Sequence, residues 1–295
     1  MINMDDADSE FIKSFEERVE KTIEEYDLLS KDDKVIVAVS GGKDSTTALY
    51  ILHKLGYSVE GMILDQLLGE YSKKNLSNIQ SFCKDLGIKL HIVHMRDEYG
   101  CSVCYIKSVL DQKGIVMNQC SICGVIRRSV LNRKAREHSA AKIVTGHNLD
   151  DEAQSFFMNY IQGRLMDSAR VGPMSGVVRN ERFVPRIKPL YFCLEEETRR
   201  YSQLHGFPVV YDPCPCSLGS FRSEIKALLN RMEEELPGTK KAIVESSLKI
   251  RPYLSSEQKD WKIKRCQSCG EPSSGDTCRV CAILSQVSGV SSNGS

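Results

Sequence analysis

Four short runs of apolar residues recur along the first half of the chain, with enough residues between them for helices. They are Val35–Val39, Val59–Leu64, Ile88–Val93 and Ala141–Thr145. Uninterrupted apolar runs of this length are typical of strands that are buried on both faces. The pattern predicts an α/β fold with βαβ units and a parallel sheet, in which ligands bind beyond the carboxyl ends of the strands.

The remaining parts of the chain are predicted to be mainly helical. In residues 10–29, apolar side chains recur every three or four positions, which indicates one amphipathic helix. Further helices are expected at 150–162, 194–205, 220–235 and 238–249, and residues 163–190 are expected to form a basic, loop-rich insertion. We divide the chain into an N-terminal helix (1–30), an α/β domain (31–210), a helical extension (211–260), a cysteine-rich module (261–285) and a flexible tail (286–295).

Charge and composition sharpen this picture. The 295 residues include 40 Lys+Arg and 39 Asp+Glu, but residues 1–33 hold twelve acidic and four basic side chains, so the rest carries a formal charge of +9. A basic body permits a polyanionic partner. No apolar run approaches the roughly 18 residues of a membrane span, and the first residues lack a signal-peptide pattern. We expect a cytoplasmic protein without membrane contact, whose twelve cysteines hold metal or do chemistry rather than form disulfides.

A glycine turn between the first predicted strand and a helix is suited to phosphate binding. Two glycines let backbone amides approach a phosphate closely, and the start of the helix adds unpaired N–H donors. It is not a Walker loop, because Val37 stands where that motif has glycine. The turn consists of Ser40, Gly41, Gly42, Lys43, Asp44 and Ser45.

This hexapeptide resembles the PP-loop of the N-type ATP pyrophosphatases. The resemblance implies an ATP site, with pyrophosphate in the loop and cleavage between the α and β phosphates to give an adenylated substrate. Asp44 is then a catalytic residue, and Leu64, Gly146 and His147 are further ATP-binding candidates. His147 alternatively has a purely structural role.

Two cysteines at the start of a predicted helix, Cys120 and Cys123, have the spacing of metal-binding or redox thiols. We expect the helix start and the following arginines to lower their pKa values. Cys214 and Cys216 follow about ninety residues later. Two thiols plus a distant third are one ligand short of a saturated iron–sulfur or zinc site, which leaves an open metal position for a substrate.

The order of PP-loop, paired cysteines, Gly-His-Asn-Leu-Asp-Asp and Cys-Pro resembles the TtuA-type tRNA 2-thiouridine synthetases, with the TtcA enzymes as near relatives. That resemblance implies a 4Fe-4S cluster held by Cys120, Cys123 and Cys214, with Cys216 as the alternative third ligand. It also implies catalytic roles for Arg127, in charge stabilisation, and for Asp151, in holding Mg²⁺ or orienting the uracil. Helix capping is the alternative role for Asp150 and Asp151.

A second set of four cysteines is predicted to form a structural zinc site. Two CxxC pairs eight residues apart suit one tetrahedral Zn²⁺, and redox dithiols are the alternative. The set consists of Cys266, Cys269, Cys278 and Cys281. An extra pair, Cys101 and Cys104, is underspecified: it is inert, binds a further metal or relays sulfur as a persulfide.

Together these features predict an ATP-dependent sulfurtransferase that adenylates the C2 oxygen of a tRNA uridine and replaces it with sulfur. The expected partners are tRNA and a sulfur donor, either sulfide or a thiocarboxylated ubiquitin-like carrier protein, and a homodimer is possible. The 163–190 insertion and the basic helix after Cys123 are expected to meet tRNA phosphates. The alternatives are a cluster-free persulfide thiolase, 2-thiocytidine synthesis, and a non-catalytic, zinc-bearing tRNA-binding subunit.

Overall fold

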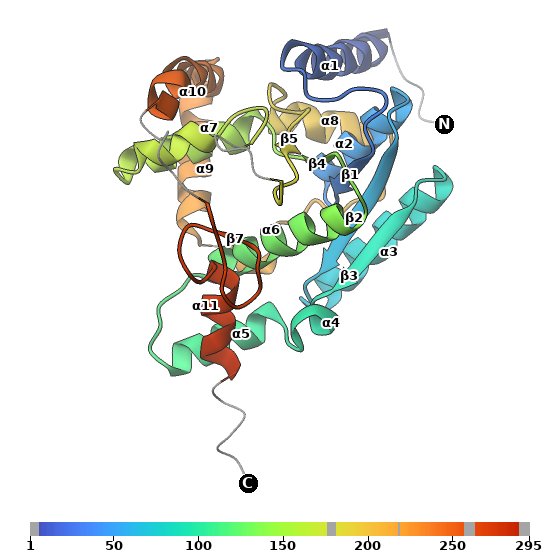
Figure 1. Ribbon diagram of the computed structural model, residues 1–295. Helices are drawn as coiled ribbons and strands as arrows, with labels where there is room; N and C mark the ends of the chain where they lie inside the picture. The colour runs from blue at the N-terminus through green and yellow to red at the C-terminus, as the bar shows by residue number, and fades with distance from the viewer. Residues whose placement is uncertain (1–5, 176–180, 218, 257–262, 289–295) are drawn as a thin grey trace.

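The computed structural model describes residues 6–175, 181–217, 219–256 and 263–288, and its centre is a five-stranded parallel sheet (Figure 1). Its strands are β1 (Val35–Ala38), β2 (Val59–Asp65), β3 (Leu90–His94), β4 (Lys142–Thr145) and β5 (Arg186–Ile187). They are ordered β3-β2-β1-β4-β5, and every neighbouring pair is parallel. The predicted sheet is confirmed. The strand order reverses between β1 and β4, so the residues after these two strands lie where such sheets bind ligands.

The fifth strand corrects one expectation. It lies inside residues 163–190, which the sequence indicates to be a loop-rich insertion, and it pairs Arg186 with Ile143 and Ile187 with Val144. The same segment contains the short helix η1 (Leu165–Arg170). A two-residue strand has no periodicity to detect, so only its partner strand reveals it.

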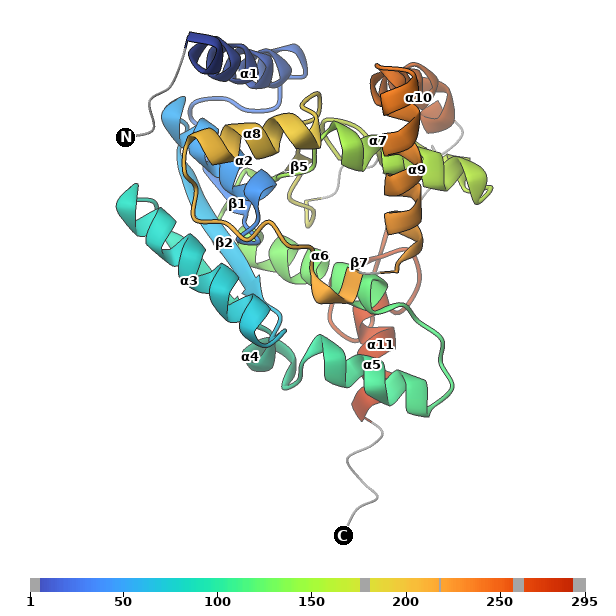
Figure 2. The same cartoon turned by 180° about the vertical axis from the view of Figure 1, so that it is seen from behind.

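Helices cover both faces of the sheet (Figures 1 and 2). Successive strand side chains point to opposite faces, so Val35 and Val37 enter one core and Ile36 enters the other. The first core also holds side chains from α1 (Asp6–Glu25), α2 (Lys43–Lys54), α3 (Glu70–Asp85) and α8 (Glu195–Leu204). The second holds side chains from α5 (Val103–Gln112) and α6 (Gln119–Glu137), with Met95 of the short α4 (Met95–Tyr99). The predicted amphipathic helix therefore exists as α1 and packs into the first core.

The helical part after the sheet has a core of its own. It joins α7 (Leu149–Ile161), α9 (Phe221–Glu235) and α10 (Thr239–Ser256) around Leu149, Tyr191 and Leu229. The helix expected at 238–249 continues through Pro252 to Ser256, and Leu254 in the added turn is buried. None of the helices that the structure describes is long and apolar enough to cross a membrane.

The cysteine-rich module packs against α6. It consists of the hairpin β6 (Lys264–Arg265) and β7 (Pro272–Ser273), followed by α11 (Arg279–Ser288). Ile283 of α11 is buried in the second core, and Glu271 forms an ion pair with Arg136 of α6. The expected tail 286–295 overlaps the end of α11, and residues 289–295 lie outside the described residues.

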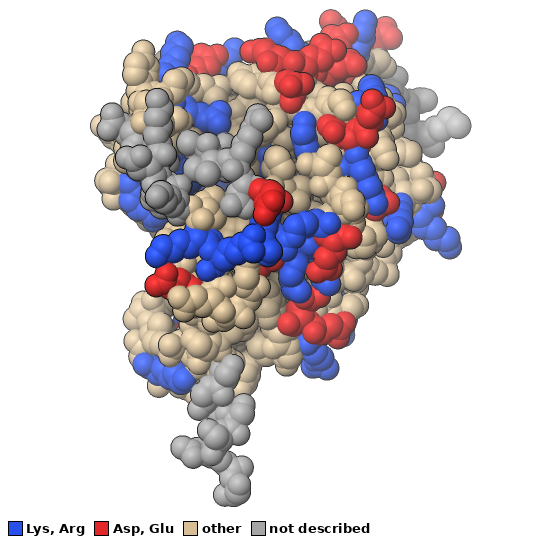
Figure 3. All heavy atoms as spheres, in the orientation of Figure 1, with Lys and Arg blue, Asp and Glu red and all other residues tan. Residues whose placement is uncertain are grey.

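Basic side chains form a band across one face of the molecule at the level of α6 (Figure 3). Several basic side chains of the 163–190 segment nevertheless form ion pairs or hydrogen bonds with other residues of the protein. Arg164 pairs with Asp167 at 2.7 Å and Lys188 with Glu152 at 2.7 Å, and Arg186 donates to the Arg128 carbonyl at 2.8 Å. Arg179 lies outside the described residues. That this segment meets tRNA phosphates stays a prediction.

Candidate nucleotide and thiol site

The glycine turn joins β1 to α2 and leaves the start of that helix open. Gly41 has a φ of +77°, and a Cβ there would lie 2.7 Å from the Cβ of Asn75, so both backbone and space require glycine. Ser45 Oγ accepts from the Ser40 amide at 3.1 Å and donates to the Gly42 carbonyl at 3.2 Å. Gly42 has no side chain to cap α2. The first amides of α2 are therefore available to an anion such as phosphate.

Lys43 is held between two carboxylates. Its Nζ lies 2.9 Å from Asp44 Oδ2 and 2.9 Å from Glu195 Oε1. Burial acts to lower the pKa of Lys43, but the two carboxylates outweigh it and the pKa is raised. Glu195 also pairs with Lys226 at 2.6 Å, and although burial opposes this, the two lysines lower its pKa to about 2. Glu195 belongs to the site, and the sequence shows no motif around it.

The segment after β4 packs directly on the glycine turn. A Cβ at Gly146 would lie 2.5 Å from the Ser45 amide nitrogen, so only glycine allows this approach. Asn148 Nδ2 donates to Asp44 Oδ1 at 3.0 Å, and His147 Nδ1 lies 2.8 Å from Thr145 Oγ1. The structure thus packs Gly146 against the loop, and ATP binding by Gly146 and His147 stays a prediction.

The two aspartates that begin α7 have different surroundings. Asp150 is buried, pairs with Lys240 and accepts from the Glu195 amide at 2.8 Å, so its role is structural. Asp151 forms a capping box with Asn148, as the capping alternative expects. Its Oδ1 also lies 3.4 Å from Arg222, and burial is the main cause that raises its pKa to about 6. Asp151 therefore caps α7 and also has a carboxyl group with a raised pKa.

The predicted ATP-binding residue Leu64 lies on the far side of the sheet from α2. Its side chain is buried in the second core. Any contact between Leu64 and a nucleotide would therefore be made by its backbone. Gln66, two residues later, has a side chain that reaches the predicted cluster cysteines, a neighbour that the sequence did not reveal.

Cys120 and Cys123 occupy the first turn of α6, where Asn118 caps the helix by accepting from the Cys120 amide at 2.8 Å. Cys123 Sγ lies 2.8 Å from Gln66 Oε1, and Cys120 Sγ lies 3.1 Å from the Cys216 carbonyl. Burial raises the pKa of both thiols, and the opposing charge of Arg127 does not outweigh it. The expectation of lowered pKa values is therefore wrong, because burial dominates the helix start and the arginine.

Cys214 and Cys216 approach this pair from the segment before α9, but they face different neighbours. Burial is the largest cause that raises the pKa of Cys120 and of Cys123, and the charge of Cys214 adds to it. Cys216, on the short helix η2 (Pro215–Ser217), interacts electrostatically with Cys214, Cys104 and Cys120. The structure thus places Cys120 and Cys123 together at the start of α6 with the Cys216 carbonyl beside Cys120, and a metal site of Cys120, Cys123 and Cys214 stays a prediction.

Arg127 connects the thiols with the nucleotide segment. Its charge acts on Cys120 and Cys123 on one side and on His147 on the other. The guanidinium of Arg128 packs over Gly124, where a Cβ would lie 3.1 Å from Arg128 Nη1. The glycine after the second cysteine of the pair therefore makes room for a basic side chain.

The four C-terminal cysteines converge as predicted. The Sγ atoms of Cys266, Cys269, Cys278 and Cys281 all lie within 4.8 Å of one another, and those of Cys269 and Cys278 are 3.7 Å apart. Zn–S bonds of about 2.3 Å in a tetrahedron place sulfurs about 3.8 Å apart, so the set fits a zinc ion. Backbone N–H groups donate to Cys266 and lower its pKa to about 6, as a zinc-binding thiolate requires.

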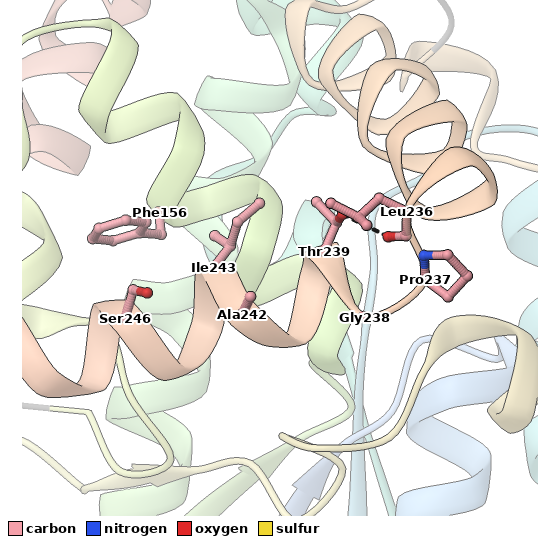
Figure 4. Close-up of a pocket in the computed structure, with 8 residues that line it drawn as sticks. All are labelled: Phe156, Leu236, Pro237, Gly238, Thr239, Ala242, Ile243 and Ser246. Carbon is pink, nitrogen blue, oxygen red and sulfur yellow. Dashed lines mark hydrogen bonds between the residues drawn. The ribbon is translucent and has the colours of Figure 1, made fainter.

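An apolar groove of about 520 Å³ lies away from these residues, between α7 and the turn that joins α9 to α10 (Figure 4). Phe156, Ile243 and Ala242 line it together with the Leu236–Gly238 turn. It contains none of the predicted site residues, and it offers few polar groups to bind a nucleotide.

Comparison with protein families gives a match over residues 11–232 to a family described as the PP-loop domain. A tRNA-5-methyluridine(54) 2-sulfurtransferase of Pyrococcus horikoshii is 36% identical over 275 residues, which cover 93% of this chain and 86% of the relative. A tRNA 2-thiolation protein, NcsA, of Haloferax volcanii is 31% identical, with 96% and 94% covered.

A solved structure is also similar. The U34-tRNA thiolase NcsA from Methanococcus maripaludis, with its [4Fe-4S] cluster, is 32% identical and has a TM-score of 0.78. The match covers 95% of this chain and 88% of that one. The similarity therefore extends over almost the whole molecule, beyond the nucleotide loop alone.

Proposed function

The chain belongs to the PP-loop domain family, and from that premise we propose that it is an ATP-dependent tRNA sulfurtransferase that makes 2-thiouridine. The relatives described above are sulfurtransferases or thiolases of tRNA by name. One observation of the structure supports the proposal: Gly146 packs directly on the Ser40–Ser45 turn, and Arg127 of α6, the helix that begins with Cys120 and Cys123, acts electrostatically on both thiols and on His147. The residues for activation by ATP and for delivery of sulfur would then belong to one site.

The nucleotide segment would activate the uridine. ATP phosphates bind the amides of Ser40–Ser45, and Lys43 leaves its carboxylate partners to contact them. The uracil C2 oxygen attacks the α-phosphate, and pyrophosphate departs. Arg127 would stabilise the charge that develops, and Asp151 would hold Mg²⁺ or orient the uracil. Sulfur then attacks C2 and displaces AMP, which is a far better leaving group than oxide.

The thiol trio would hold a cluster. Cys120, Cys123 and Cys214 offer three thiolates, and a 4Fe-4S cluster bound by three cysteines supplies one iron to hold hydrosulfide. Cys214 is proposed as the third ligand from the family resemblance, and Cys216, whose carbonyl lies 3.1 Å from Cys120 Sγ, is the alternative. Gln66 is placed to orient Cys123 or the base that approaches it.

The other components follow from the same family. Zn²⁺ would occupy the four C-terminal cysteines. A cytoplasmic location is supported by the free thiols, since none of the cysteines is in a disulfide.

A homodimer is also proposed, with the groove of Figure 4 and the exposed Leu236 that lines it as an apolar contact. Leu236→Lys should then shift the sedimentation coefficient toward the monomer.

A reconstituted reaction tests the proposal. Anaerobic protein with its metals, ATP, sulfide and unmodified tRNA should yield one pyrophosphate per 2-thiouridine in nucleoside mass spectrometry. Asp44→Ala should abolish both products, while Asp85→Ala at the exposed end of α3 should change neither. Thiolation without release of pyrophosphate would contradict ATP activation. Formation of 2-thiocytidine would show that the substrate is a cytidine rather than a uridine. Full activity of iron-free protein would favour the persulfide alternative.

The relatives are named for two tRNA positions, 54 and 34. Two tRNA substrates, each with one of these uridines replaced by cytidine, distinguish the positions. The substrate that fails to react identifies the modified uridine. If both react, the enzyme modifies either both positions or neither, and a tRNA with both uridines replaced distinguishes the two cases.

A further inference from the structure

Two basic side chains of α9 contact the carboxylates that begin α7 and α8. Lys226 Nζ lies 2.6 Å from Glu195 Oε2, and Arg222 Nη1 lies 3.4 Å from Asp151 Oδ1. Arg222 Nη2 also donates to Ser155 Oγ at 2.8 Å. Because Arg222 and Lys226 are four residues apart, they are neighbours on one face of α9. This face of the helical extension therefore adjoins the nucleotide segment.

Glu195 places Lys226 next to the lysine of the glycine turn. Its Oε1 pairs with Lys43 at 2.9 Å while its Oε2 pairs with Lys226, so both ammonium groups lie beside one carboxyl group. The amide of Glu195 is fixed by the buried Asp150, to which it donates at 2.8 Å, and the first turns of α7 and α8 lie side by side (Figure 2). Lys226 is therefore held at the edge of the proposed phosphate site.

Asn148 connects the second ion pair to the same turn. Its Nδ2 donates to Asp44 Oδ1 at 3.0 Å, and its Oδ1 accepts from the Asp151 amide at 3.1 Å. One side chain thus links Asp44 in the glycine turn to the carboxylate that Arg222 contacts. Arg222 approaches the turn from α7, as Lys226 approaches it from α8.

The packing of α9 does not depend on these ion pairs. Ile225 and Leu229 of α9 are buried in the same core as Leu149. Arg222 and Lys226 are instead 45% and 43% exposed, and pairs as exposed as these contribute little to stability. An ammonium group has three N–H donors and a guanidinium group has five, so both side chains keep donors for a further anion.

We propose that Lys226 and Arg222 bind the β- and γ-phosphates of ATP, opposite the amides of the glycine turn, while their carboxylate partners hold them in place. The inference rests on the proposed function only through its ATP site. In that reaction a bond forms from the uracil oxygen to the α-phosphorus, and the bond from this phosphorus to the bridging oxygen breaks. The electron pair leaves with pyrophosphate, whose charge the two cations stabilise.

Binding measurements without tRNA test the contact. Equilibrium dialysis of the full-length, metal-loaded protein gives the dissociation constants of ATP, pyrophosphate and AMP. Lys226→Met and Arg222→Gln should each weaken the binding of ATP and pyrophosphate about tenfold, the effect of one charge-assisted hydrogen bond. The binding of AMP should not change, because AMP has no β- or γ-phosphate. Unchanged binding of ATP and pyrophosphate, or an equal loss for AMP, would overturn the proposal.

Two further variants separate phosphate binding from a structural role. Arg231→Gln is the matched control, because Arg231 is exposed on α9 nine positions after Arg222 and so on the opposite side of the helix. It should bind all three ligands as wild type does. Lys226→Arg keeps the positive charge and should bind ATP more tightly than Lys226→Met. Equal losses in these two variants of Lys226 would assign the effect to packing and overturn the proposal.

Measurements with tRNA distinguish this inference from the proposed function. The affinity for tRNA without ATP should be the same in Lys226→Met as in wild type. Loss of tRNA binding with normal ATP binding would assign the cations to RNA and overturn the contact with ATP. If the variants lose ATP binding as expected but wild type makes no 2-thiouridine, the tRNA activity is wrong and the phosphate contact stands. If wild type binds no ATP, both are wrong.

Discussion

The molecule contains two groups of converging cysteines that differ in how their thiols are held. In the C-terminal module, four Sγ atoms lie within 4.8 Å of one another, and backbone N–H groups donate to two of the sulfurs. At the start of α6, the thiols of Cys120 and Cys123 instead contact the oxygen atoms of Cys216 and Gln66. Donated hydrogen bonds stabilise a thiolate, whereas oxygen acceptors stabilise the protonated thiol.

The pKa values follow this difference only in part. N–H donors lower the pKa of Cys266 to about 6, but burial raises the pKa of Cys269 and Cys281 as it raises the pKa of Cys120 and Cys123. Among the described residues, the four C-terminal cysteines form a group of ligand atoms within 4.8 Å, as one metal ion requires, whereas Cys120, Cys123 and Cys214 do not. The proposed cluster ligands would bind separate irons, which need no such close approach.

The largest expected effect comes from breaking the α6 group alone. Cys123→Ser should abolish iron binding and thiolation while it leaves the zinc content and the thermal unfolding midpoint nearly unchanged, because the two groups bind metal separately. Metal analysis, activity and circular dichroism measure the three properties. Cys83→Ser removes a thiol that lies in the first core and belongs to neither group, so it controls for the loss of a single thiol. Loss of zinc from Cys123→Ser would show that the groups are not independent.

Breaking the C-terminal group should have a broader but smaller effect. Cys278→Ser should lose zinc and lower the unfolding midpoint by several degrees, since metal binding contributes folding energy to this short module. Iron retention should fall only in part, because Val125 of α6 packs against the module next to Cys123. Calorimetry and metal analysis test this. An unchanged midpoint without zinc would mean that the module folds through its own packing.

The hydrogen bond between Gln66 and Cys123 offers a subtler test. Gln66→Leu removes the acceptor at 2.8 Å, a contact worth about 1 kcal/mol. Iron should stay bound, while the visible absorption or reduction potential of the cluster shifts and kcat falls severalfold. Gln162→Leu at the end of α7 is an exposed control. Identical spectra and rates in Gln66→Leu would show that this amide has no role once metal is bound.

The smallest effect is expected from the ion pair between the module and α6. Arg136 and Glu271 are both partly exposed, so Glu271→Gln should cost about 1 kcal/mol or less in the free energy of unfolding, measured with urea. Zinc and iron contents should remain at the values of wild type. A drop of iron content in Glu271→Gln would indicate that the α6 thiols need the module packed against α6 in order to hold iron.

Much of the fold and site could be predicted from the sequence because the signals are local. Uninterrupted apolar runs gave four of the five strands, since periodicity is a property of neighbouring residues. The PP-loop and both paired-cysteine motifs are short segments whose geometry depends on glycine conformation and cysteine spacing. Convergence of the four C-terminal cysteines follows from the same spacing.

Only the tertiary structure decided the rest. Glu195 reaches Lys43 across 152 positions and Gln66 reaches Cys123 across 57, and no local pattern marks such partners. The direction of the thiol pKa shifts also depended on burial, which sums contributions from many distant residues and here exceeded the effect of Arg127. The sequence therefore determined which chemical groups are present, and packing determined which of them meet.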